Sequence, residues 1–307
     1  MHDPFGARLS LFTGKGGVGK STLVAALAVE AARRGLSPLV VELGHRASMQ
    51  AVFGAPEVGH APALVAPGVH ATNVDLDRTL LDYVAAHVRV RAIARRIGAS
   101  ASLRRFFEAA PAVAEVLTLW RIERLLAEER PGGAPRFSHL LVDLDATGHA
   151  LMFLELPRVF AGLADSGPIA ALLDSFTALL SDRATTRLHV VTLPGRLPVT
   201  ETIELVRRLE AEHEVPLGSV FVNRVRAAPL SPEAEPVLAG LRGREPHAAL
   251  REDLGLLEAA LAAHRARRRE LARLEALPLS RVELPWLRGP IDARALEVLG
   301  RVAAGAA

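Results

Sequence analysis

The sequence predicts an α/β fold, with a doubly wound, mostly parallel sheet of about seven or eight strands and helices on both faces. Short apolar runs alternate with longer segments in which apolar residues recur at helical spacing, as in repeated strand–helix units. Near the start of the chain, an apolar strand, a glycine-rich loop and a helix follow one another. With 307 residues, 50% hydrophobic and 23% charged, the chain has the balance of a folded globular protein, which excludes a disordered or rod-like one.

Each expected strand is a short apolar segment bounded by loop residues. The first precedes the glycine loop, and a helix over residues 22–34 follows that loop. Residues 77–130 and 150–184 have helical periodicity, and we expect them to be insertions that form a helical subdomain within a single domain, residues 1–307. The expected strands lie near residues 8–13, 38–43, 69–74, 138–143, 187–193, 218–223 and 280–284.

The composition excludes several classes of function. The chain has no cysteine, so disulfides, thiolate zinc sites, iron–sulfur clusters and cysteine nucleophiles are excluded. The net charge of +3 is weak evidence for nucleic-acid binding. The first residues lack a secretion signal, and no uninterrupted apolar run reaches about 18 residues. We therefore expect a cytoplasmic protein without a transmembrane segment.

The glycine loop satisfies the phosphate-loop pattern G-x-x-x-x-G-K-[ST]. Glycines let the backbone approach a phosphate without a Cβ clash, and the following helix directs its first N–H groups at the same anion. We expect Lys20 to reach the β- and γ-phosphates of ATP, and the Ser21 hydroxyl to bind Mg²⁺. The expected nucleotide-binding residues of this loop are Gly14, Lys15, Gly16, Gly17, Val18, Gly19, Lys20, Ser21 and Thr22.

Lys15 and Lys20 are the only lysines in the chain, and ordinary phosphate loops do not require the first of them. The string Lys-Gly-Gly-Val-Gly-Lys-Ser-Thr resembles the deviant Walker A signature of the MinD, ParA, nitrogenase iron protein and ArsA class of P-loop ATPases. In that class the extra lysine reaches across a dimer interface to the partner's nucleotide. The resemblance thus implies a catalytic role for Lys15 in a dimer, similar to an arginine finger supplied in trans. The alternative is a solvated loop lysine.

A later segment narrows the resemblance to the ArsA family. It begins where the strand at residues 138–143 ends, and it resembles that family's D-T-A-P-T-G-H…L-P stretch. The resemblance implies that Asp143 helps to hold Mg²⁺ and that Thr147 and Gly148 couple the γ-phosphate to helix movement. Asp145 departs from the family's pattern, which has no acidic residue there. The matching residues are Asp143, Thr147, Gly148, His149, Leu156 and Pro157.

Asn223 ends the strand at residues 218–223, which resembles the family's strand whose final asparagine reads adenine. Its amide carries the donor and the acceptor that match the adenine edge. Residues 187–193, followed by Thr200 and Glu201, also resemble the family's V-T-x-P…E-T stretch. The alternative for Asn223 is an asparagine that only caps a strand end.

Glu42 is our candidate for positioning the attacking water. In the arsenite-pump and targeting members of the family an aspartate after the second strand does so, but Gly44 stands at that position here. Glycine cannot orient water, and loss of such a group typically costs about 10²–10⁴-fold in rate. His45 and Asp145 are the other candidates, and the alternative for Glu42 is a strand-end carboxylate paired with an arginine.

The absence of cysteine limits what the family resemblance implies. The family includes arsenite-pump ATPases and the factor that targets tail-anchored membrane proteins. Arsenite binding needs soft thiolate ligands, and the targeting factor's zinc clasp needs cysteines, so we expect neither property here. The chain resembles a cysteine-free, bacterial-type paralogue.

Apolar residues of the first insertion are candidates for a client groove or, alternatively, for internal core: Leu103, Phe106, Phe107, Val113, Val116, Leu117, Leu119 and Trp120.

Together these features predict an ATP-binding, Mg²⁺-dependent ATPase that acts as a nucleotide-switched dimer, with a second copy or a paralogue, on a protein client or partner. One alternative, favoured by Gly44, is a hydrolysis-deficient nucleotide-binding scaffold or partner subunit of a related ATPase. A ParA- or MinD-like positioning ATPase is disfavoured by the residues 147–149 and by the low net charge.

We expect the basic run at residues 264–273 to be a solvated helix face, with a phospholipid or nucleic-acid patch as its alternative. Nucleic acid is not an expected partner, whereas peripheral membrane contact stays open.

Overall fold

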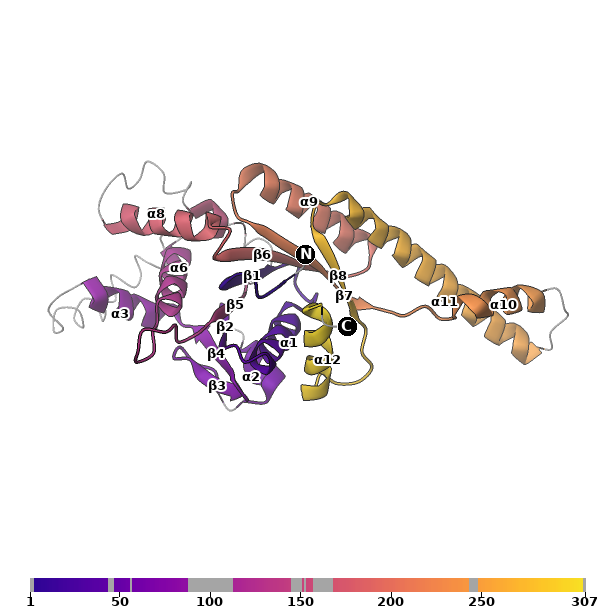
Figure 1. The fold of residues 1–307 in the computed structure, drawn as a ribbon. Helices are drawn as coiled ribbons and strands as arrows, with labels where there is room; N and C mark the ends of the chain where they lie inside the picture. Colours follow the sequence, from indigo (N-terminus) through magenta and orange to yellow (C-terminus); the bar gives the residue numbers. More distant parts are fainter. Residues whose placement is uncertain are drawn as a thin grey trace.

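The structure, a computed structural model, describes residues 3–43, 47–55, 57–87, 113–144, 151, 153–156, 168–242 and 248–305. An eight-stranded sheet forms its centre, with the strand order β3-β4-β2-β5-β1-β6-β7-β8 (Figure 1). Neighbouring strands run parallel, except that β3 pairs antiparallel with β4. The predicted α/β fold with a mostly parallel sheet is therefore confirmed.

All of the expected strands are present, and the structure adds one at the edge of the sheet. The added strand, β3, spans only four residues, of which Leu64 is 64% exposed, so it lacks the buried apolar run of the inner strands. A turn in which Gly68 has φ +73° joins it to β4. The strands are β1 (Leu9–Thr13), β2 (Pro38–Leu43), β3 (Ala63–Ala66), β4 (Val69–Val74), β5 (His139–Asp143), β6 (Thr186–Thr192), β7 (Leu217–Val225) and β8 (Ser280–Pro285).

Helices cover both faces of the sheet (Figure 1). Helices α1, α2 and α12 pack on one face, while α6, α8 and α9 pack on the other. The helices are α1 (Lys20–Arg33), α2 (Ser48–Phe53), α3 (Leu76–His87), α6 (Val113–Leu126), α8 (Pro168–Ser181), α9 (Arg196–Glu212), α10 (Glu235–Arg242), α11 (Ala248–Ala272) and α12 (Ala293–Ala303), with the short 3₁₀ helices η1 (Pro232–Ala234) and η2 (Arg273–Ala276).

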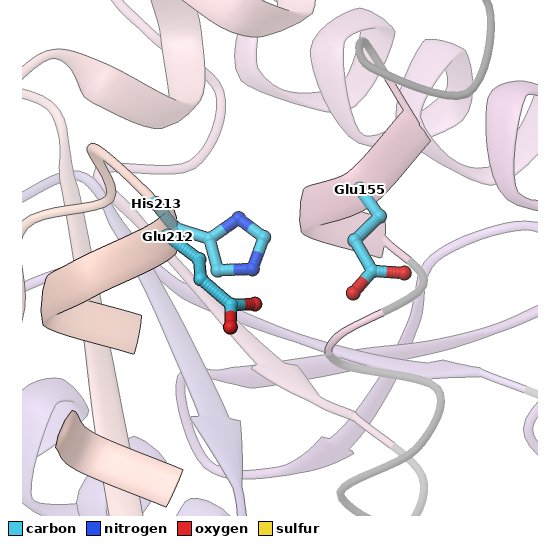
Figure 2. A group of neighbouring side chains, drawn as sticks. All are labelled: Glu155, Glu212 and His213. Carbon is cyan, nitrogen blue, oxygen red and sulfur yellow. The ribbon is translucent and has the colours of Figure 1, made fainter. Parts of the chain in front are cut away.

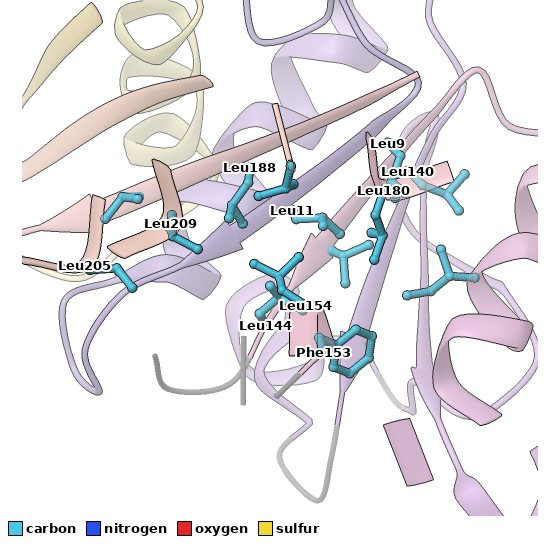
Figure 3. Close-up of a cluster of buried hydrophobic side chains, with 14 of the residues drawn as sticks. Leu9, Leu11, Leu140, Leu144, Phe153, Leu154, Leu180, Leu188, Leu205 and Leu209 are labelled. Carbon is cyan, nitrogen blue, oxygen red and sulfur yellow. The ribbon is translucent and has the colours of Figure 1, made fainter. Parts of the chain in front are cut away.

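Two apolar cores lie on the two faces of the sheet, because successive strand residues point to opposite sides. Leu9 and Leu11 of β1 belong to the core beneath α8 and α9, and Figure 3 shows them among leucines of neighbouring elements. Phe12, the next residue, belongs to the core beneath α1. Both strand faces are thus buried, which explains why the strands appear in the sequence as continuous apolar runs. Each fully buried leucine stabilises the fold by about 1.5–3 kcal/mol relative to an exposed one.

Part of the proposed client groove lies in the interior. Leu119 and Trp120 of α6 are 1% and 7% exposed and belong to the core beneath α8 and α9. Leu117 packs against Leu80 and Val84 of α3. The core interpretation therefore holds for these three residues of α6. The candidates at residues 103–107 lie outside the described residues.

The connection from β7 to β8 forms a helical arm. Helix α11 extends beyond the sheet, and α10 lies near its far end (Figure 1). The basic run lies at the other end of α11, where Arg268 contacts Glu283 of β8 at 2.8 Å and Arg273 contacts Glu270 at 2.8 Å. These exposed arginines thus form ion pairs with glutamates of the same chain. Among the described helices, none has both the length and the apolar character needed to span a membrane.

Candidate functional site

The glycine loop lies at the carboxyl end of β1 and leads directly into α1. Gly14 has φ +149°, and a Cβ there would lie 2.2 Å from the carbonyl oxygen of Val191 on β6. Only glycine fits such a close approach between two backbones. Gly16 and Gly17 are exposed at the tip of the loop, with nothing within 4 Å of the position of a Cβ. The loop therefore packs tightly at its base and offers open backbone at its tip.

Lys20 is the first residue of α1, and only 8% of it is exposed. Its Nζ donates to the carbonyl oxygens of Gly14 at 3.0 Å and of Lys15 at 3.4 Å. The ammonium group is thus held over its own loop by backbone carbonyls. This arrangement places a buried cation beside the first N–H groups of a helix, which together favour an anion.

The side chain of Ser21 on α1 contacts that of Asp143 at the end of β5, the strand beside β1. The Ser21 Oγ donates to the Asp143 Oδ2 at 2.5 Å. Asp143 is the last residue of β5, which pairs with β1 and brings Asp143 opposite Phe12. A hydroxyl and a carboxylate are oxygen ligands of the type that Mg²⁺ binds in nucleotide sites, so the residues present fit this ion.

Glu42 lies on β2, opposite Asp143 of β5 in the sheet register, and is 2% exposed. Burial raises the pKa of Glu42 to about 7; the Met49 N–H, which donates to its Oε1 at 2.9 Å, opposes this shift, and the Asp143 carboxylate adds to it. Its partners in the described residues are backbone N–H groups of Met49 and Ser48 at the start of α2, not an arginine. This carboxyl group can exchange a proton near neutral pH. The other candidates for positioning the water are His45 and Asp145, and both lie outside the described residues. Gly44, which stands where the family has the aspartate, lies outside them too.

Lys15 forms an ion pair within its own chain. Its Nζ contacts the Oε1 of Glu201 on α9, and the two side chains are 57% and 35% exposed. A cavity of about 320 Å³ lies between the loop and α9, lined by both of these residues and by Pro198 and Leu205. The sequence pointed to Glu201 only as part of a family-like stretch and gave no sign of this pairing, because 186 residues separate the two side chains.

Asn223 lies against the phosphate loop. Its Nδ2 donates to the carbonyl oxygen of Val18 at 2.9 Å, and the side chain is 6% exposed. The sequence led us to expect Asn223 to read adenine, and that role stays a prediction. The contact with Val18 is a second role that the sequence did not suggest.

A separate polar group joins α9 to the segment after β5. Figure 2 shows Glu155, Glu212 and His213, whose ligand atoms all lie within 4.8 Å of one another. Arg208 donates to Glu155 and to Glu212 at 2.9 Å each. Because one guanidinium already compensates both carboxylates, we interpret this group as an ion-pair network and not as a metal site.

Of the ArsA-like segment, Leu156 is buried, whereas Thr147, Gly148, His149 and Pro157 lie outside the described residues.

A strand, a glycine loop and a helix that begins with lysine and serine, beside an aspartate at the end of the adjacent strand, define a P-loop nucleotide-binding protein. The sequence model of the anion-transporting ATPases, the ArsA family, matches residues 7–165. This chain belongs to that family of ATPases.

Among the proteins similar to this chain are three from bacteria. The chain is 31% identical to the ATPase BagA of Mycobacterium tuberculosis over 306 residues, which cover 94% of this chain and 89% of that protein. It is 28% identical to an arsenical pump-driving ATPase of Escherichia coli over 162 residues, which cover 52% of this chain and 27% of that protein. An arsenical pump-driving ATPase of Acidiphilium multivorum is 26% identical over 52% of this chain and 27% of its own length.

Proposed function

We propose that this protein binds ATP with Mg²⁺, hydrolyses it, and acts as a nucleotide-switched dimer on a protein client or partner. The observation that carries this proposal is the contact between Ser21 and Asp143, next to the buried Lys20, at the carboxyl ends of β1 and β5. A buried cation and two oxygen ligands beside a helix N-terminus suit a triphosphate and its metal ion. The paralogue or second copy would form the dimer through the face that carries the loop.

Each residue of the site has a distinct role in this proposal. Lys20 and the loop N–H groups hold the phosphates, and Ser21 and Asp143 hold Mg²⁺, which compensates phosphate charge when bound. A water molecule attacks the γ-phosphorus, the bond from that phosphorus to the β–γ bridging oxygen breaks, and the β-phosphate leaves with the electron pair. Glu42 accepts the proton of the water, since its pKa of about 7 allows it to be ionised at neutral pH.

Replacing Lys20 tests the binding site. Lys20→Ala should weaken ATP binding by at least about tenfold, because a hydrogen bond between charged groups contributes about 1.5–3 kcal/mol. The fold should survive, because the ammonium group lies on the loop, where it donates to the carbonyl oxygens of Gly14 and Lys15, and not in the apolar core. Calorimetric titration with Mg-ATP measures the affinity, and Arg33→Ala at the other end of α1 is the matched control. An unchanged affinity in Lys20→Ala would remove the proposal.

A scaffold that binds ATP without hydrolysing it is the second candidate. The glycine at position 44, where the arsenite-pump and targeting members have aspartate, favours it. Steady-state phosphate release by the wild type with Mg-ATP separates the two candidates. Sustained release establishes the ATPase, whereas tight ATP binding without release, alone and beside candidate partners, establishes the scaffold.

A further inference from the structure

The phosphate loop is held in place by the end of a distant strand. Asn223 on β7 and Val18 in the loop are 205 residues apart, yet the Asn223 Nδ2 donates to the Val18 carbonyl oxygen at 2.9 Å. The Val18 side chain is 3% exposed and packs in the core beneath α1, together with Phe12 and Phe221. Val18 is therefore fixed by its side chain on the core and by its carbonyl oxygen on Asn223.

The amide of Asn223 also packs directly on the backbone of the loop. Gly19 has φ +95°, and a Cβ there would lie 2.2 Å from the Asn223 Nδ2. A glycine at this position leaves the space that the amide occupies, one residue before Lys20. The position of the amide thus determines where the last part of the loop enters α1.

The orientation of this amide is set by the protein itself. The Asn223 Oδ1 accepts from the backbone N–H of Arg224 at 2.8 Å, and Arg224 is the one non-glycine residue with positive φ in the described part of the chain, at +58°. A flipped amide would face the Val18 carbonyl with an oxygen and the Arg224 N–H with a donor. Both contacts would then be repulsive, so the donor and acceptor ends are assigned by geometry. Within the part of the chain that the structure describes, one N–H and one lone pair of the amide have no further partner, so they can meet a ligand.

We propose that Asn223 is a positioning residue for the phosphate loop, in addition to its expected contact with adenine. With the nucleotide bound as proposed above, on which this role rests, one amide contacts the base and also positions the groups that bind the phosphates. Through Val18 and Gly19 it fixes the N–H groups and Lys20 that meet the phosphates. Its remaining donor and acceptor match the edge of the base. Base recognition and phosphate binding are thereby joined through a single side chain.

A ligand that has phosphates but no base tests this role. Mg-tripolyphosphate and Mg-ATP are titrated calorimetrically into the wild type and into Asn223→Ala. If Asn223 positions the loop, the dissociation constants of both ligands should rise, that of tripolyphosphate by about fivefold or more, as expected for a lost buried hydrogen bond. Asn73→Ala on β4, the same substitution at the same end of the sheet, is the matched control and should change neither constant.

Hydrogen–deuterium exchange of the ligand-free protein gives an independent readout. The peptide that covers residues 14–22 should exchange faster in Asn223→Ala than in the wild type, because the loop has lost its tie to β7. If the alanine variant does not fold, Asn223→Ser takes its place, since serine is too short to reach Val18.

Two results would overturn the inference: weaker ATP binding with unchanged tripolyphosphate binding, which makes Asn223 a base reader alone, or unchanged loop exchange. A wild type that binds neither ligand would instead remove the proposed function, and the exchange measurement would still test whether Asn223 holds the loop.

Discussion

At the scale of single residues, Glu42 combines deep burial with an ionisable group. Its pKa is raised from 4.5 to about 7, so between these pH values the unfolded chain releases a proton that the folded protein retains. The folded state therefore loses stability relative to the unfolded state as the pH rises through this window. The cost is fully present above pH 7 and absent below the unfolded value. A buried carboxylate with this cost at neutral pH is typical of a functional position.

Glu42→Gln should remove this pH dependence. The variant should be more stable than the wild type at pH 8, by on the order of 2–3 kcal/mol, and the difference should shrink toward zero at pH 4. The glutamine oxygen can still accept from the Met49 N–H, so local structure is retained. Urea unfolding at the two pH values measures the difference. Equal stabilities at pH 8 would show that the carboxyl group is ionised without cost.

The same substitution tests the catalytic role. Glu42→Gln should bind Mg-ATP normally and lose at least about tenfold in turnover, because an amide cannot accept the proton of the attacking water. The wild-type kcat/KM should rise as the pH increases through about 7, where Glu42 of the free protein becomes ionised. Phosphate release measured from pH 6 to pH 9 checks both statements. Wild-type turnover in the variant would transfer the role to His45 or Asp145.

At the scale of elements, α9 contacts both the phosphate loop and the segment after β5. Glu201 near its start pairs with Lys15 of the loop, and Arg208, two turns later, pairs with Glu155 in the segment after β5. An exposed ion pair contributes only about 0–1 kcal/mol, so Lys15 can leave Glu201 at little cost. In a drier interface between two chains, the attraction between Lys15 and a phosphate would be much stronger.

ATP should therefore strengthen self-association, and Lys15→Ala should weaken it. Glu201→Gln is the matched variant, because it removes the intrachain partner and keeps Lys15; its association with a non-hydrolysable ATP analogue should equal or exceed that of the wild type. Lys15→Arg should restore association only in part, since the guanidinium has a different geometry. Sedimentation with the analogue bound measures each variant. Wild type and Lys15→Ala dimerising equally would make Lys15 a loop lysine only.

The sequence predicted the elements better than the contacts between them. The seven other strands were predicted to within about two residues, whereas β3 was missed because it is short and half exposed. The glycine loop follows from local pattern alone. The pairs Lys15–Glu201 and Asn223–Val18 span 186 and 205 residues, and only the strand order brings their members together.

At the scale of the whole molecule, the last helix supports the first. Gly300 of α12 packs on α1 so closely that a Cβ would lie 2.3 Å from the Ala26 carbonyl oxygen. The Asp292 side chain caps α12 by accepting from the Ala295 N–H at 2.8 Å. Because α1 begins with Lys20 and Ser21, the position of α12 bears directly on the phosphate site.

Gly300→Leu should separate these two helices. We expect a loss of about 1–3 kcal/mol in the free energy of unfolding, the usual cost of overfilling a packed interface, together with weaker Mg-ATP binding. Gly255→Leu on the exposed part of α11, where nothing lies within 4 Å of a Cβ, is the control and should not destabilise the fold. Urea unfolding and calorimetry measure the two effects. Equal stability of the two variants would contradict tight packing at Gly300.

The short β3 strand also restricts how copies of this protein can meet. An edge strand with free backbone groups invites a second sheet to continue it, which leads to open-ended growth. Here β3 offers only four residues between Pro62 and Pro67, and a proline on either side supplies no N–H. At the opposite edge, β8 ends at Pro285 and carries the charged side chains of Arg281 and Glu283. Neither border favours an endless ribbon, so we expect the proposed dimer to form away from the sheet edges, through the face that carries the loop.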